Sequence, residues 1–136
     1  MKKIFFIIGL CSLTGITYSQ ELRDANNSLK GFISKDGSVQ DKNNTTIGYF
    51  KNDGSVQDIH NKKLGYVLGR EFLDVNHQSV GYLQKDGIVE DAQHTALGRI
   101  DPTGTGSVKD SHNQTIGNIS KVEPSWAAAY FFYFKF

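Results

Sequence analysis

The sequence predicts an all-β fold in which short antiparallel hairpins repeat around a closed ring with five-fold pseudo-symmetry. Three observations support this. An Asp–x6–Gly motif occurs six times. The glycines follow one another at intervals of 17, 17, 16, 17 and 19 residues. Turn-forming residues separate short β-branched and aromatic segments within each copy. A fixed period with one unit per copy indicates an architecture in which each unit buries its apolar face against its neighbours. The repeated residues are Asp24, Asp41, Asp58, Asp74, Asp91 and Asp110 with Gly31, Gly48, Gly65, Gly81, Gly98 and Gly117.

The copy at residues 38–54 illustrates the expected unit. Alternation around Val39 and Asp41 predicts one strand, and the segment 47–50 predicts a second. The turn-rich residues 42–45 join them, and Asp53-Gly54 closes the unit with a tight turn. Asp36-Gly37 and Asp86-Gly87 repeat this tight turn, whereas residues 68–70 and 101–106 depart from it.

Short links force neighbouring strands to pair antiparallel, and closing the ring removes exposed sheet edges. The five intervals between the glycines predict about five blades. The remaining copy, residues 22–38, would then supply a strand to the last blade and tie the N-terminal segment to the C-terminal repeat. The repeated glycine lies inside a strand, which suggests close approach of another backbone near a crowded axis, or a bend.

We expect three segments: a signal peptide at 1–19, a β-repeat domain at 20–122 and an aromatic tail at 123–136. Lys2 and Lys3 precede the apolar residues 4–13, and Thr17 and Ser19 suit a cleavage site after Ser19. Export would place the chain in the periplasm, at the outer membrane or outside the cell. Lipidation at Cys11 is the alternative, although Leu10 is larger than that processing prefers.

The tail carries Trp126, three alanines and six aromatic residues among the last seven. Ser125 and the alanines favour a helix, which we expect to pack over one end of the ring. The alternatives are an interface for self-association or a membrane surface. A final strand of an outer-membrane barrel is a further alternative, but such strands are about twice as long.

The pattern V-x-D followed by [IL]-G-[YF], alternating with K-D-G, resembles the bacterial five-fold β-flower family of small exported proteins without an assigned activity. The similarity covers residues 22 to about 121 and the aromatic tail. It implies five-fold pseudo-symmetry and carries over no catalytic residue. The copies around Leu68 and Thr103 match this pattern less well.

All four histidines lie two or three residues after a repeated Asp, where other copies have asparagine: His60, His77, His94 and His112. Both residue types tolerate left-handed backbone angles, so we interpret the histidines as turn residues. The alternative is a rim that binds a transition metal or responds to acid. We interpret the repeated Asp residues as Asx turns, with a calcium site as the alternative.

Aromatic residues follow the glycine in four copies, including Tyr49, Tyr66 and Tyr82, and packing between blades is their expected role. They could instead stack on a sugar or a peptide. Loss of Lys2 and Lys3 would change the formal net charge from +1 to −1, which argues against a nucleic-acid partner. No catalytic arrangement stands out from the repeat. We therefore expect a non-enzymatic envelope protein without a cofactor, with a binding or scaffolding role and a glycan or an envelope protein as its partner. The alternatives are a carbohydrate- or peptide-binding module that uses one rim, and an enzyme.

Overall fold

The computed structural model describes residues 20–136, so the expected signal peptide and Cys11 lie outside the described part of the chain. Twelve strands form a closed antiparallel barrel within these residues, and a short helical tail follows them. The strands are β1 (Glu21–Asp24), β2 (Leu29–Ile33), β3 (Ser38–Asp41), β4 (Thr46–Phe50), β5 (Ser55–Asp58), β6 (Lys63–Leu68), β7 (Glu71–Leu73), β8 (Ser79–Leu83), β9 (Ile88–Asp91), β10 (Ala96–Ile100), β11 (Gly106–Asp110) and β12 (Thr115–Ser120).

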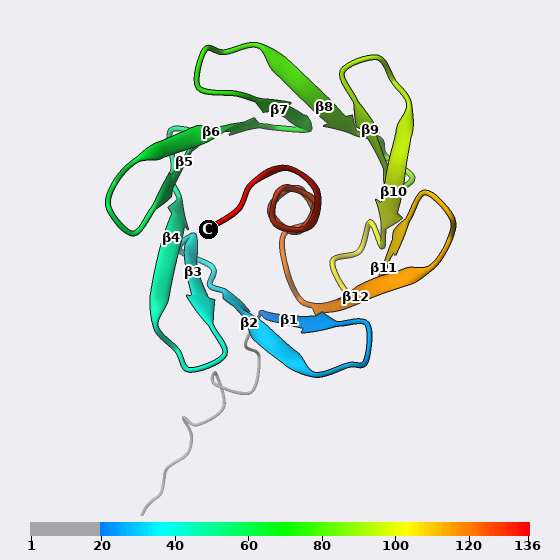
Figure 1. The fold of residues 1–136 in the computed structure, drawn as a ribbon, viewed down its shortest axis with the longest axis horizontal. Coiled ribbons are helices and arrows are strands. Elements are labelled where there is room, and N and C mark those ends of the chain that lie inside the picture. Colours follow the sequence, from blue (N-terminus) through cyan, green and yellow to red (C-terminus); the bar gives the residue numbers. More distant parts are fainter. Residues whose placement is uncertain (1–19) are drawn as a thin grey trace, which may run out of the picture.

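Each Asp–Gly copy forms one complete hairpin, and the hairpin loops project outward from the ring (Figure 1). The residues 20–120 therefore contain six hairpins, which corrects the expected five blades with a partial sixth copy. The copy at residues 22–38 provides a full hairpin, β1–β2, because each of its halves is long enough to pair. Closure occurs where expected: β1 pairs with β12, with Leu22 opposite Ile119.

A β-bulge recurs in every hairpin immediately before the repeated glycine. In β3–β4, Gly48 pairs with Val39 and Thr46 pairs with Gln40, which leaves Ile47 as the extra residue. A bulge bends its strand and increases its twist, so its recurrence helps each hairpin to turn away from the axis. Five of the six bulge residues are aliphatic and pack against the core: Ile47, Leu64, Val80, Leu97 and Ile116.

The first strand of each hairpin contributes one fully buried apolar side chain to the interior of the barrel. These residues are Leu22, Val39, Val56, Phe72, Val89 and Val108. The second strand contributes the repeated glycine and, two residues later, a larger apolar residue such as Phe50 or Ile100. This alternation is the period-two pattern of a strand with one face toward a core.

The tail fills the centre of the ring (Figure 1). It consists of α1 (Pro124–Ala128) and the π-helical turn η2 (Ala129–Tyr133). The helix is as expected, but Glu123 rather than Ser125 is its N-cap. Its position inside the ring also corrects the expectation that it covers one end. Ala127, Ala128 and Ala129 are completely buried. Alanine adds little volume, which allows the helix to run between the large side chains of the barrel wall. Neither helical segment is long and apolar enough to cross a bilayer.

The aromatic residues of the tail lie against the repeated glycines, one to each of five hairpins. Going along the tail, the pairs are Phe131 with Gly117, Phe132 with Gly98, Tyr133 with Gly81, Phe134 with Gly65, and Phe136 with Gly48. The Phe134 N–H donates to the Ala129 carbonyl over 2.9 Å, which is the i to i+5 bond of a π-helix. This wider turn rotates each successive residue by a smaller angle than an α-helix does, which suits the step between neighbouring hairpins.

The hairpin β1–β2 departs from this pattern. The three atoms nearest to a Cβ on Gly31 would all be backbone atoms of Gln40 and Asp41. The residue before it is Lys30, and its Nζ lies 5.5 Å from the ring centroid of Tyr130 and 5.7 Å from that of Phe131. The cation–π contact replaces the aliphatic contact that the other five hairpins make.

Candidate functional site

The outer turns hold all six repeated aspartates in the same Asx geometry. In each turn, Oδ1 accepts the backbone N–H groups of the second and fourth following residues; for Asp58 these are His60 at 2.8 Å and Lys62 at 2.9 Å. The same pair of bonds occurs at Asp24, Asp41, Asp74, Asp91 and Asp110. Bonds to the Lys62 and His60 amides lower the pKa of Asp58, and those to Gln114 and His112 lower the pKa of Asp110. These carboxylates therefore stabilise the turns in which they lie.

The four histidines are exposed in these outer turns, but they fall into two classes. His77 and His94 have φ angles of 65° and 66° and occupy the left-handed position of the turn. In the turns of His60 and His112 the following residues, Asn61 and Asn113, take that position instead. Within residues 20–136, no three His, Cys, Asp or Glu side chains form a group that could hold a metal ion.

Tyr49, Tyr66 and Tyr82 lie on the outer wall of the barrel, and the last two contact a histidine of the next hairpin. Tyr66 stacks on His77 with ring centroids 4.2 Å apart, and Tyr82 stacks on His94 at 4.7 Å. His94 Nδ1 also lies 3.0 Å from Glu90 Oε1. Within residues 20–136, Tyr49 does not stack on a histidine, and the Lys51 Nζ lies 5.5 Å from its ring centroid. These stacks cover one face of Tyr66 and of Tyr82 and connect adjacent hairpins.

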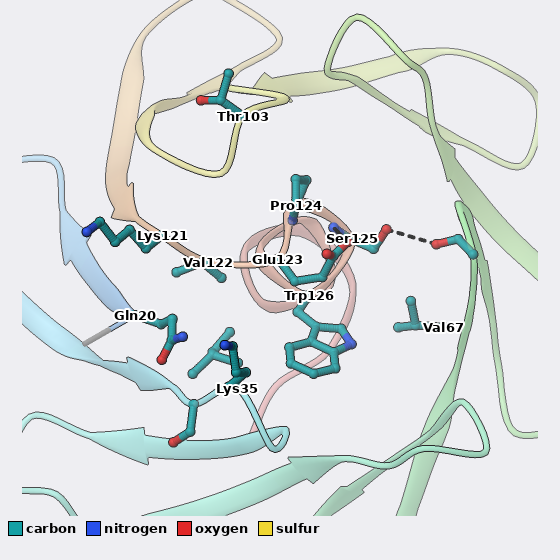
Figure 2. A pocket seen from close by; sticks show the side chains of 13 residues that line it. Gln20, Lys35, Val67, Thr103, Lys121, Val122, Glu123, Pro124, Ser125 and Trp126 are labelled. Atoms are coloured by element: carbon teal, nitrogen blue, oxygen red, sulfur yellow. Dashed lines mark hydrogen bonds between the residues drawn. The ribbon is translucent and has the colours of Figure 1, made fainter. Parts of the chain in front are cut away.

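A cavity of about 630 Å³ opens at the end of the ring where the tail enters it. We call this the mouth cavity. Figure 2 shows Gln20, Lys35 and Lys121 on one side, Val67 on the other, and the Trp126 indole between them. Its volume lies within the range of about 300–1,000 Å³ that is typical of small-molecule sites.

Trp126 is held in the mouth cavity by its own contact with Phe50 and by the hydrogen bonds of its neighbour Ser125. Its ring stacks on Phe50 with centroids 5.3 Å apart and an interplanar angle of 10°. The preceding Ser125 donates its hydroxyl to the Gly69 carbonyl over 2.8 Å, which connects α1 to the turn between β6 and β7 (Figure 2). Glu123 caps the helix by accepting the Ser125 N–H. Half-buried Trp126 therefore has a fixed orientation.

The residues singled out in the sequence do not predict this site. None of the predicted contact residues lines the mouth cavity, since the three tyrosines lie on the outer wall and the four histidines on the outer turns. The cavity brings together residues from both ends of the repeat domain, Lys35 and Lys121 among them, with the tail. A single tryptophan in an otherwise repetitive chain was the available signal, because it breaks the symmetry of the repeat.

The closed ring of hairpins around a central tail defines a pseudo-symmetric β-repeat protein. The chain belongs to a family whose model is described as the 5-fold beta-flower protein and matches residues 15–135. This match confirms the resemblance that the repeated motif indicated. No curated protein and no solved structure matches the chain.

Proposed function

We propose that this chain is an exported, non-enzymatic binding module and that the mouth cavity takes its ligand. The observation that carries the proposal is the half-buried indole of Trp126 within a cavity of about 630 Å³. An aromatic face beside polar groups suits a ligand that is flat and apolar on one side and polar at its edges. A carbohydrate fits this description, and the aromatic stacking partner is Trp126 rather than the tyrosines of the outer wall.

The titratable residues of the cavity support a binding role over catalysis. Among the described residues that line the cavity, the titratable groups are Lys35, Lys121 and Glu123. One carboxylate with no second carboxylate or histidine beside it does not make up an acid–base pair. The proposed export is supported by the basic, then apolar, then small residues of segment 1–19.

The experiment is a fluorescence titration of the chain without residues 1–19. Trp126 is the only tryptophan, so any change in tryptophan emission reports on the mouth cavity. A panel of oligosaccharides and short peptides is added, and thermal unfolding is followed in parallel because a bound ligand raises the melting temperature. We expect saturable emission changes with saccharides. An unchanged emission and melting temperature with every compound would refute the proposal.

A matched pair of variants separates binding from folding. Trp126→Phe keeps an aromatic ring against Phe50 and should retain the fold with reduced affinity, which is measured from the ligand-dependent melting temperature because this variant has no tryptophan. Tyr82→Phe removes a hydroxyl from the outer wall and should retain affinity. Equal loss of affinity in both variants would argue against the mouth cavity as the site.

A further inference from the structure

A second, smaller cavity of about 60 Å³ adjoins the mouth cavity at the beginning of α1, and Glu123, Pro124 and Ser125 line both. Arg70 and Lys85 line the second cavity, as Lys35 and Lys121 line the first. Each of these four cations belongs to a different connection at this end of the ring. Against them, Glu123 is the one carboxylate among the residues that line the two cavities.

In two turns that connect neighbouring hairpins, a lysine and the aspartate that follows it line different surfaces. Lys35 lines the mouth cavity, whereas its neighbour Asp36 lines a groove on the outer wall beside Tyr49. Lys85 and Asp86 divide in the same way, with Asp86 beside Arg99 on the outer wall. Each Asp is engaged by its own turn: Asp36 Oδ1 accepts the Ser38 N–H at 3.0 Å and the Ser38 hydroxyl at 2.8 Å.

Lys35, Arg70 and Lys85 do not form ion pairs with these carboxylates within residues 20–136. The ion pairs Arg23–Glu21 and His94–Glu90 do not include a residue that lines either cavity. Lys35, Arg70 and Lys85 are exposed. A ring of exposed cations around a concave site concentrates positive potential there and attracts anions.

We infer that the ligand of the mouth cavity is an anionic saccharide, with a sugar ring on the Trp126 indole and its carboxylate or sulfate groups on Lys35, Arg70 and Lys85. This inference rests on the proposed function and specifies its ligand class. The indole supplies the apolar contact, and the cations select charged over neutral sugars. Uronates and sulfated sugars share this chemistry.

The test compares four probes by tryptophan fluorescence at 50 mM NaCl: a galacturonic acid hexamer, a heparin-derived hexasaccharide, maltohexaose and hexaglutamate. We expect one or both anionic saccharides to bind more tightly than maltohexaose and hexaglutamate. Raising NaCl to 500 mM should weaken that binding, because salt screens exposed charges. Binding by the heparin fragment alone would assign sulfate, and binding by the uronate alone would assign carboxylate.

The variant Lys35→Gln/Lys85→Gln removes one cation from each cavity. The control Lys51→Gln/Lys62→Gln removes the same charge from the outer wall and an outer turn. We expect the first variant to lose about three- to ten-fold in affinity for the anionic hexamer, and the control less than about two-fold. Both should keep the wild-type melting temperature.

Four results would overturn the inference. Maltohexaose that binds as tightly as the anionic saccharides would leave the binding site in place but remove its charge selectivity. Tighter binding of hexaglutamate would replace the saccharide by an acidic peptide. Equal losses in the two double variants would assign the effect to overall charge. If none of the probes binds, the inference fails, and the proposed function then depends on the wider panel.

Discussion

Phe131 lies against Gly117 so closely that a Cβ on the glycine would stand 2.5 Å from Cε1 of the ring. The carbonyl oxygen of Arg23 would lie 2.7 Å from the same Cβ. The glycine is therefore required by a side chain of the tail and by a neighbouring strand together. A tail aromatic ring lies similarly close to the repeated glycine in four more hairpins. These contacts hold the tail in the centre of the ring.

The substitution Gly117→Ala should destabilise the fold. Backbone and ring would both have to move, and overpacking of this kind costs about 1–3 kcal/mol. Urea unfolding measures the loss. The control is Gly69→Asn: a Cβ on Gly69 meets nothing within 4 Å, and asparagine tolerates its φ of 66°. A Gly117→Ala protein as stable as the control would contradict the packing described for the tail.

The backbone angle of His77 predicts which histidine substitutions are tolerated. His77→Asn should change the free energy of unfolding by less than about 0.5 kcal/mol. His77→Val should cost about 1–2 kcal/mol, because a β-branched residue is strained at its φ of 65°. His60→Val is the matched control, since Asn61 holds the left-handed position in that turn. Equal losses of stability in His77→Val and His60→Val, measured by urea unfolding, would refute the assignment of the left-handed position to His77.

Acid should weaken the outer turns. Hydrogen bonds from the Lys62 and His60 amides lower the pKa of Asp58 in the folded chain. A lowered folded-state pKa gives stability that is fully present above the unfolded value, about 3.9, and is lost as pH falls through the folded value. We therefore expect the urea midpoint to be level from pH 7 to about pH 5 and to fall below about pH 4.

Asp58→Asn tests the cause of this acid sensitivity. Its amide oxygen can accept the same two N–H groups but does not titrate in this range. The variant should lose less of its urea midpoint between pH 7 and pH 3 than the wild type loses. An identical loss would show that Asp58 does not contribute to the pH dependence.

The repeat made the hairpins, their turns and the closure of β1 on β12 predictable, because period and alternation are local properties of the sequence. The number of hairpins was wrong by one, since counting intervals between glycines omits the first copy. The central position of the tail could not be predicted from the sequence, because it depends on the fit between aromatic rings and glycines up to 88 residues apart. The mouth cavity was not predicted for the same reason, because Lys35 and Trp126 are distant in sequence and come to line one cavity only when the ring closes.

The proposed binding of ligand at Trp126, in the mouth of the ring, is tested most directly by NMR. One indole N–H signal is expected in a ¹H–¹⁵N spectrum of the chain without residues 1–19, because the sequence has one tryptophan. We expect this signal and the Gly69 amide to shift saturably with the preferred anionic hexasaccharide, while the amides of the outer turns, such as Asn44 and Asn113, do not shift. An indole signal that stays in place while outer-turn amides shift would refute binding in the mouth cavity.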